Sequence, residues 1–217
     1  MIEATQSGGS RAGALPLIGN ELALDLANTS SGRGHATHRD HLERAEHVVA
    51  WARHARALSS SDGDKLEAEL AANPKLAQRL LRRTLELREA VHMIGQAIAT
   101  RRAADAGAIE QLKHIHAECV ARAKLVPHGA SFVWGWDPAD GVVEAVLGPV
   151  TLSALTLLTQ SDLSRVKQCQ GDRCGWLFFD TTKNKSRRWC EMEVCGNRAK
   201  QRRFHRRQAG GKDDRGG

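Results

Sequence analysis

The chain has 217 residues, of which 41% are hydrophobic and 26% are charged, a balance typical of a soluble globular protein. Aromatic residues make up only 4% and tyrosine is absent, so the core must rely on leucine, alanine and valine, which favours helices. We expect no apolar stretch long enough to span a bilayer, and no membrane partner. The first residues lack the basic and apolar regions of a secretion signal, which predicts a cytoplasmic protein.

The net charge of +7 is distributed unevenly along the chain. Residues 165–217 contain 15 lysines and arginines against 6 acidic residues, whereas residues 1–164 contain 17 against 19. This asymmetry predicts that the C-terminal part of the protein meets a polyanion and that the N-terminal part does not.

Helical periodicity dominates the first part of the chain. Residues 1–18 contain several glycines, which predicts a flexible leader. Pro74 suits the first turn of the longest predicted helix. Residues 20–28 alternate as in a strand, but their alanines and leucines favour a short helix. Apolar and capping patterns predict further helices over residues 41–58, from Ser60 or Ser61 to 72, 74–103 and 105–124.

One later segment carries the signals of a β-hairpin. Residues 131–136 and 142–146 are rich in β-branched and aromatic side chains, and they flank a turn of suitable chemistry at Asp137–Gly141. Pro149 suits the first turn of the apolar helix expected next. The sequence therefore predicts a helical domain over residues 19–164 that contains one hairpin.

Four of the five cysteines form two pairs near the C-terminus. Cys169 and Cys174 enclose four residues, as do Cys190 and Cys195, and fifteen residues separate the pairs. This spacing predicts a tetrahedral site for one structural zinc ion. Disulfides, inert thiols or a redox-active dithiol are the alternatives, although a reducing cytosol disfavours disulfides. We expect the fifth cysteine, Cys119, to be buried in the core.

Glycines and aromatic residues surround the four cysteines. Gly175 and Gly196 follow Cys174 and Cys195, where a tight metal-binding turn needs positive φ or a close approach of backbone to sulfur. The apolar run that ends at Asp180 predicts a strand over the metal. This segment also contains the aromatic residues Trp176, Phe178, Phe179 and Trp189. We expect them to pack around the zinc site, and stacking on nucleic-acid bases is the alternative.

A strongly basic helix is predicted directly after the last cysteine. Residues 197–207 contain no helix breaker, and their arginines form two neighbouring ridges, with Phe204 opposite as an apolar anchor. Like charges at this spacing destabilise an isolated helix, so we infer that they meet nucleic acid rather than another polyanion or solvent alone. The candidate nucleic-acid-binding residues are Lys183, Lys185, Arg187, Arg188, Arg198, Lys200, Arg202, Arg203, Arg206 and Arg207.

Two further groups are weaker candidates for a site. His35, His38 and His41 could hold a second metal ion, although exposed histidines need no such explanation. Asp25 and Asn28 lie three residues apart and could line a ligand pocket, or they could only cap and hydrogen-bond within the fold. No catalytic motif is recognisable, so we do not expect an enzyme.

Two motifs resemble known families. The segment from Cys169-x₄-Cys174-Gly-Trp-Leu-Phe to the run Cys195-Gly-Asn-Arg198 resembles the CGNR-type zinc finger. The segment Leu22-Ala-Leu-Asp-Leu-Ala-Asn-Thr29 is similar to the opening of the ABATE domain, which usually precedes this finger, except that two of its alanines are smaller than usual. The resemblance implies a bacterial, stress-related transcription regulator with zinc on the four cysteines.

The sequence as a whole predicts a mainly α (α+β) protein in four parts. These are a leader (1–18), an ABATE-like helical domain (19–164), a zinc finger ending in a basic helix (165–208) and a disordered tail (209–217). The predicted function is zinc-dependent DNA binding, with an N-terminal domain that senses a small-molecule effector or forms a homodimer. RNA or ribosome binding is one alternative, and an enzyme with a purely structural finger is the other.

Overall fold

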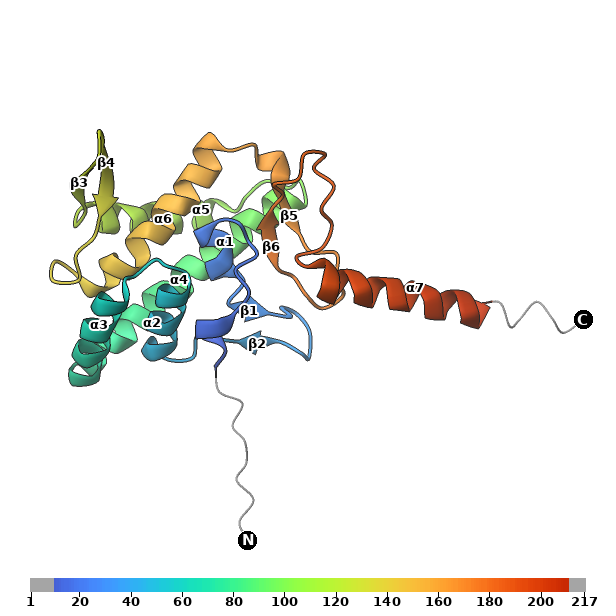
Figure 1. Ribbon diagram of the computed structural model, residues 1–217, viewed down its shortest axis with the longest axis horizontal. Helices are drawn as coiled ribbons and strands as arrows, with labels where there is room; N and C mark the ends of the chain where they lie inside the picture. Colours follow the sequence, from blue (N-terminus) through green and yellow to red (C-terminus); the bar gives the residue numbers. More distant parts are fainter. Residues whose placement is uncertain (1–9, 211–217) are drawn as a thin grey trace, which may run out of the picture.

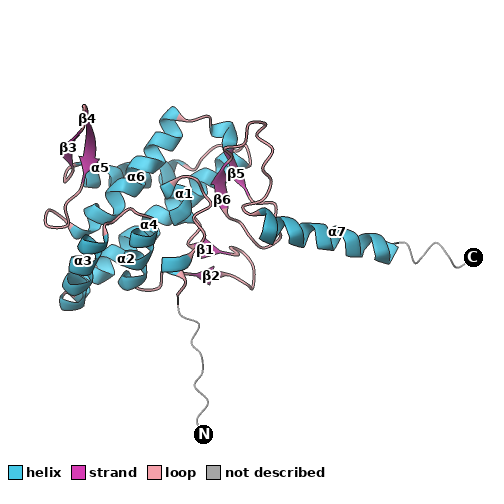
Figure 2. Cartoon of the chain, in the orientation of Figure 1, coloured by secondary structure: helices cyan, strands magenta, loops and turns pink. Residues whose placement is uncertain are grey.

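Helices make up most of the computed structural model, which describes residues 10–210, with side chains to residue 205 (Figures 1 and 2). The predicted mainly α (α+β) fold is confirmed. The predictions that fall on residues 1–9 and 211–217 lie outside the described residues. The helices are α1 (Leu22–Ala27), α2 (Ala45–His54), α3 (Ser60–Ala72), α4 (Pro74–Ala99), α5 (Ala106–Val120), α6 (Val142–Gln160) and α7 (Asn197–Gly210).

The strands form three separate antiparallel pairs, and none of these pairs joins another into a larger sheet within residues 10–210. β1 (Ser30–Ser31) pairs with β2 (Arg39–Asp40), β3 (Lys124–His128) with β4 (Ser131–Gly135), and β5 (Val166–Gln168) with β6 (Leu177–Phe179). The first pair lies beside α1, the second projects from the far end of the molecule, and the third carries the cysteines (Figure 1).

The 26-residue helix α4 is the centre of the N-terminal domain, and α1, α2, α3, α5 and α6 all pack against it. It begins as predicted at Pro74, where the side chain of Asn73 accepts a hydrogen bond from Leu76 N at 3.2 Å. Its inner face buries Leu80, Leu87 and other apolar residues completely. Each such leucine contributes about 2 kcal/mol of hydrophobic stabilisation, so this face fixes the domain.

Several predicted helix ends extend too far. Helix α2 ends at His54 rather than at residue 58, and α4 ends at Ala99 rather than at 103. Left-handed backbone conformations follow both helices, with φ of 58° at Arg56 and 56° at Arg101, which stop the helical hydrogen bonding. Beyond α5, Lys124 belongs to strand β3.

The predicted hairpin has one correct strand and one wrong partner. Strand β4 pairs with the preceding segment β3 through a two-residue turn that begins at Gly129, where φ is 59°. The β-branched run from Val142 to Val146 instead opens helix α6, where it is buried on all sides. Tertiary burial therefore overrides its strand propensity. Pro149 consequently lies inside α6, not in a first turn, and costs the helix one backbone hydrogen bond.

Helix α6 also corrects the expectation that no stretch could span a bilayer. It is long and apolar enough by length and composition, with a mean hydropathy of 1.7, and it is the one such helix among the described residues. However, 61% of that stretch is buried inside the protein, as in the core helix of a soluble protein. It is therefore weak support for a membrane span.

Part of the predicted leader is packed rather than flexible. Residues 10–18 lie against α2, with Ala12 and Leu15 buried. The hydroxyl of Ser10 donates to the carbonyl of His41 at 2.6 Å, and the ring of His54 bonds the carbonyl of Leu15 at 2.7 Å. At the other end, residues 209 and 210 continue α7 rather than starting a disordered tail.

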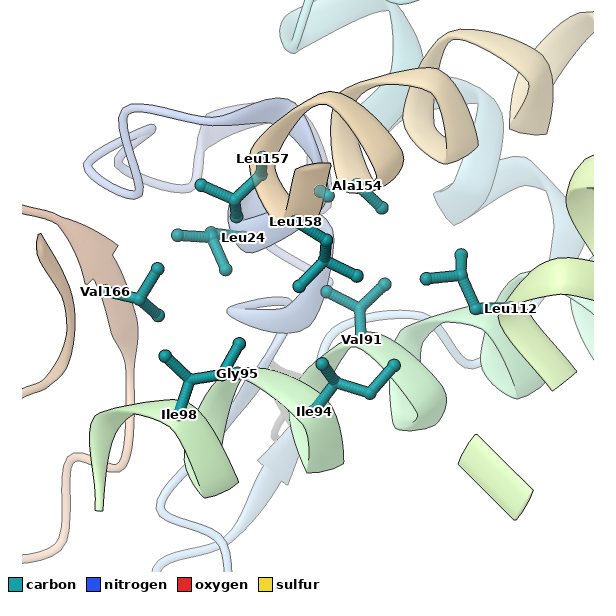
Figure 3. A pocket seen from close by; sticks show the side chains of 11 residues that line it. Leu24, Val91, Ile94, Gly95, Ile98, Leu112, Ala154, Leu157, Leu158 and Val166 are labelled. Atoms are coloured by element: carbon teal, nitrogen blue, oxygen red, sulfur yellow. The ribbon is translucent and has the colours of Figure 1, made fainter. Parts of the chain in front are cut away.

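The β5–β6 pair packs into the core of the N-terminal domain. Val166 of β5 and Leu177 of β6 belong to the same buried cluster as α1, α4 and α6. Figure 3 shows Val166 facing Leu24 and Ile98 across an apolar hollow. The hollow has a volume of about 10 Å³, room for about one water molecule, so it is a packing joint and not a ligand pocket.

Candidate metal centre and basic helix

The four cysteines of the C-terminal segment converge on one point. Their Sγ atoms all lie within 4.8 Å of one another, and Cys190 Sγ lies 3.6 Å from both Cys174 Sγ and Cys195 Sγ. Four sulfurs at about 2.3 Å from a zinc ion would be about 3.8 Å apart, close to these distances. A disulfide needs an S–S distance of about 2.05 Å, so the cysteines are free thiols. The cluster is able to bind one zinc ion, as predicted.

Short elements place the four thiols. Cys169 directly follows β5, and its N–H donates to the carbonyl of Trp176 at 2.8 Å, which closes the first cysteine loop. Cys174 ends a turn in which its N–H donates to Gly171 O at 3.1 Å. Cys195 lies in the π-helical turn Met192–Gly196, which runs directly into α7. The last ligand is therefore continuous with the basic helix.

The glycine with the closest approach to the sulfurs is one that sequence reasoning missed. A Cβ on Gly171 would lie 2.9 Å from Cys195 Sγ and 3.3 Å from Cys169 Sγ, and its N–H donates to Cys169 Sγ at 3.3 Å. Gly175 adopts a φ of 73°, as expected of a tight turn. A Cβ on Gly196 would overlap Met192, so that glycine allows a close approach to a thioether and not to the cluster.

The thiols do not ionise independently. Hydrogen bonds from Cys174 and Cys190 lower the pKa of the Cys169 thiol, and the same bonds to Cys169 raise the pKa values of Cys174 and Cys190. The pKa of the Cys195 thiol is also lowered, so the cluster favours ionisation of two thiols and opposes ionisation of the other two. A bound cation would supply the charge that lets all four thiols act as thiolate ligands.

Asn28 joins the cysteine segment to the N-terminal domain. Its side chain donates to Leu177 O at 2.9 Å and accepts from Leu177 N at 2.8 Å, so it pairs with β6 as another strand would. Only 3% of Asn28 is exposed. The side chain of Asp25 accepts from Gly19 N at 2.8 Å, and burial raises its pKa to about 6. Both residues therefore hydrogen-bond within the fold, as the simpler of the two expectations has it, and neither lines a described cavity.

Asp180 organises the connection between the two cysteine pairs. Its carboxylate is fully buried and accepts from Lys167 Nζ at 2.6 Å and from Arg187 N at 3.0 Å. Burial opposes the charge, but the bonds from Lys167 and Thr182 hold the pKa of this carboxyl well below its usual range. An aspartate two residues before a threonine is the local signal for such a turn.

Several predicted nucleic-acid-binding residues instead stabilise the fold. Arg187 donates to Ile18 O at 3.0 Å and to Trp189 O at 3.2 Å, and its guanidinium lies 4.2 Å from the centre of the Phe178 ring. Lys185 Nζ lies 2.6 Å from a carboxylate oxygen of Asp162. Arg188 and Arg202 also have acceptors within the fold, in Gln170 at 2.9 Å and Asp172 at 2.6 Å.

Of the other predicted contacts, those with described side chains are exposed: Lys183 lies in the loop after β6, and the rest lie on α7, which extends away from the body of the molecule (Figure 1). Lys183, Arg198, Lys200 and Arg203 form no ion pair with the described residues. Arg206 and Arg207 lie on α7, but their side chains fall outside the described part. Phe204 is 58% exposed, so the predicted apolar anchor on the zinc module is wrong.

Family comparisons agree with this arrangement of a helical domain followed by a cysteine cluster. Residues 165–208 match the CGNR zinc finger. Residues 20–161, more than half of the chain, match ABATE, which is described as "Putative stress-induced transcription regulator". The chain belongs to the ABATE family. No curated protein sequence matches the chain.

An open cavity lies beside the cysteine cluster, between the cysteine segment and the N-terminal part of the chain. It has a volume of about 270 Å³, and Cys174, Cys190 and Cys195 form part of its wall. Its other walls include the exposed arginines Arg11, Arg173 and Arg198 and the aromatic ring of Trp176. No local sequence pattern predicts this cavity, because its wall combines residues from three distant segments.

The histidines of residues 35–41 follow the simpler expectation and form no second metal site among the described residues. His38 Nε2 lies 2.9 Å from Ser30 Oγ, and His41 Nε2 lies 3.4 Å from Ser31 Oγ. These bonds belong to the β1–β2 pair. Among residues 10–210, the four cysteines are the one group of metal-binding side chains close enough to share an ion.

Proposed function

We propose that this ABATE-family protein is a DNA-binding transcription regulator in which zinc orients helix α7. The observation that carries the proposal is the continuity of the cysteine cluster with that helix. Cys195 is separated from the first residue of α7 by Gly196 alone. A zinc ion bound there would cross-link the helix to the first cysteine loop and serve a structural role.

The distribution of ion pairs also supports α7 as the DNA-binding surface. Arg53, Arg83 and Arg88, in the N-terminal domain, each contact a carboxylate. Among the described side chains of α7, Arg198, Lys200 and Arg203 have no carboxylate partner, and unpaired cations on one projecting helix suit phosphate binding. The matching acidic surface is therefore expected outside the chain, on the nucleic acid.

Alanine variants test this surface. Replacing Arg198 and Arg203 together removes two exposed cations from α7, and we expect the affinity for duplex DNA to fall about tenfold or more. The matched control removes Lys65 and Lys113, which are equally charged but lie in the N-terminal domain. Equal losses in both double variants would count against α7 as the contact.

RNA or ribosome binding is the alternative for the same surface. The module contains aromatic rings, but Phe178 is fully buried and Trp189 partly so, which leaves them less available for base stacking. We therefore expect tighter binding to duplex DNA than to single-stranded RNA of the same length. A clear preference for the single strand in a competition assay would favour the alternative.

The cavity beside the cluster supports the proposed sensing role. The wall carries three exposed arginines against two carboxylates, Asp172 and Glu191, and Asp172 is already paired with Arg202. The remaining positive charge and the ring of Trp176 suit a small anionic effector, such as a carboxylate or a phosphate ester. A thermal-shift screen with small organic anions and matched neutral analogues tests it. Stabilisation by an anion that Arg173→Ala abolishes is expected, and equal responses to the neutral analogues would contradict it.

We assign no catalytic role. The residues that motivated an enzyme, Asp25 and Asn28, are engaged in hydrogen bonds that hold the chain together. A regulator needs no reaction at the zinc centre, and four thiolate ligands would leave no open position for a substrate.

A further inference from the structure

The β3–β4 hairpin presents an unusually apolar surface. It lies at the opposite end of the molecule from α7 (Figure 1). Its large hydrophobic side chains are exposed, and they include the most exposed ones of the described chain. The exposed fractions are 59% at Leu125, 43% at Val126, 66% at Phe132, 44% at Val133 and 44% at Trp134. A soluble protein rarely leaves so contiguous an apolar patch without a partner.

The strand register collects these side chains on two faces. Leu125 lies opposite Trp134, and Pro127 lies opposite Phe132, so these four residues share one wholly apolar face. The opposite face carries the valines. Both faces are exposed, so the hairpin lacks the covered side that would normally stabilise a two-stranded sheet.

The two edges of the hairpin differ in their capacity to pair. In an antiparallel pair, hydrogen-bonded and non-hydrogen-bonded residue pairs alternate. Pro127 lacks an N–H, so its pair with Phe132 is a non-hydrogen-bonded one, and the pairs on either side of it are hydrogen-bonded. The backbone groups of Phe132 and Trp134 therefore point outward from β4. The outer edge of β3 is interrupted by the proline, whereas the outer edge of β4 is open.

The base of the hairpin is fixed to the domain. Trp136 Nε1 donates to Cys119 O at 2.8 Å, and its ring packs on Gly148, where a Cβ would overlap it. A rigid base lowers the entropy cost of ordering the hairpin against a partner. The patch is therefore held in one position rather than hanging free.

The hairpin is nearly uncharged in a chain of net charge +7. Within residues 124–136 the ionisable side chains are Lys124, which pairs with Asp140 at 2.5 Å, and His128. A nucleic acid therefore has no reason to bind here. A second copy of the same surface meets it without repulsion between like charges, and charge depletion is typical of an interface core.

We propose that this protein forms a homodimer in which the β4 strands of two copies pair edge to edge around a two-fold axis. The contact joins the two hairpins into a four-stranded antiparallel sheet, in which Phe132 and Trp134 of the two copies lie side by side on one face. Such an interface is self-complementary, as a two-fold dimer requires. It also leaves α7 of both copies free at the far ends.

The exposed apolar area sets the strength of this dimer. Only the side chains and the outer edge of β4 meet the other copy in this arrangement, so two copies bury roughly 700 Å² in total. This area lies below that of stable specific interfaces, so we expect a weak dimer that dissociates in the upper micromolar range. A reversible equilibrium is therefore expected rather than an obligate dimer.

Sedimentation of the zinc-loaded full chain, without DNA, over about 1 to 300 µM tests the proposal. A reversible monomer–dimer equilibrium is expected, and the double variant Phe132→Ser/Trp134→Ser is expected to weaken it at least tenfold. The matched control Ile109→Ser changes a side chain of equal exposure (45%) on α5 and should leave the equilibrium unchanged. Amide exchange of the β4 peptide should slow at high concentration, because its outward N–H groups become paired.

A monomer at every concentration would overturn the proposal. So would a dimer that the double variant leaves intact, or hairpin residues that bind lipid vesicles or another protein while the chain stays monomeric. Circular dichroism of the variants separates loss of the interface from loss of folding. Because no DNA is present, failure of this test does not contradict the proposed DNA-binding function. Failure to bind DNA would likewise not contradict the dimer.

Discussion

Asn28 and Asp25 lie three residues apart on and beside α1, and each has a distinct structural role. Asn28 holds strand β6, and Asp25 holds the backbone of Gly19. The sequence places the two residues together but gives no sign of these partners. Leu177 is 149 residues from Asn28, and no local pattern reports a contact over that distance.

Replacing Asn28 by alanine should destabilise the whole chain. The variant leaves both backbone groups of Leu177 buried and without a partner, which costs about 2 to 4 kcal/mol in free energy of unfolding. Chemical denaturation measures this. The control is Asn20→Gly, which removes an exposed hydrogen bond to Phe179 O without straining the φ of 60° at that position, and should cost about 1 kcal/mol or less. Similar losses of unfolding free energy for both variants would contradict the role of the buried Asn28 side chain in connecting α1 to β6.

Asp25 should make stability depend on pH. Burial, partly offset by the bond from Gly19, raises its pKa from 3.8 to about 6, so the folded protein binds a proton that the unfolded chain releases. The stabilisation from this proton is full below about pH 4 and is lost as the pH rises through about 6. Asp25→Asn should remove that loss, so the variant gains stability relative to the parent between these values. A difference that is constant with pH in denaturation curves would refute the assignment.

At the scale of the elements, periodicity predicts the helices and fails at their ends and at the hairpin. The apolar spacing of α4 has one solution, because only a helix places all its leucines on one side. The run from Val142 is compatible with a strand or with a buried helix, and its burial on every side in α6 favours the helix. Strand β3 contains Pro127 and was missed, because proline rarely occurs in strands.

The cysteine segment was predictable because its constraint is local. Two four-residue loops with free thiols leave few arrangements besides a shared metal ion. The close approach of Gly171 to two sulfurs was not predictable, because Cys195 comes from a different loop. Spacing therefore identifies the ligands but not the packing around them.

Gly171→Ala should weaken zinc binding without removing a ligand. The added Cβ would lie 2.9 Å from Cys195 Sγ, so backbone must shift and the N–H donated to Cys169 Sγ is displaced. Loss of such a supporting bond typically lowers metal affinity about 10- to 100-fold. Competition with a chromogenic chelator measures the affinity. Gly13→Ala, where the added atom meets only ordinary contacts, is the control and should have no effect.

At the scale of the whole molecule, the finger and the ABATE domain share one core. Val166 and Leu177 lie in the buried cluster of the N-terminal helices, and Asn28 bonds β6 directly. The sequence suggests two separate modules, because composition and charge change near residue 165. The packing of Val166 and Leu177 across that boundary depends on how the side chains fit together in three dimensions, and amino-acid composition carries no information about that fit.

Removal of zinc should therefore lower the stability of the N-terminal domain as well as that of the zinc finger. With a chelator present, we expect the thermal unfolding of the entire chain to shift to lower temperature as one transition, because binding to the native state alone stabilises all of it. Far-ultraviolet circular dichroism follows the helices of the N-terminal domain. Cys174→Ser should reproduce the shift, whereas Cys119→Ser, which changes a buried thiol outside the cluster, should not abolish the response to chelator. Two separate transitions, with the N-terminal one unmoved, would argue against a shared core.

The central claim is that zinc orients α7 for DNA, and the salt dependence of duplex binding with and without zinc tests it most directly. Contacts to about six phosphates predict a slope near −5 when the logarithm of the binding constant is plotted against that of the salt concentration. We expect this slope for the zinc-loaded protein, and at least a tenfold weaker affinity after zinc is removed, with recovery when zinc is restored. Binding to no duplex, or binding with the same affinity and slope in the absence of zinc, would contradict the account.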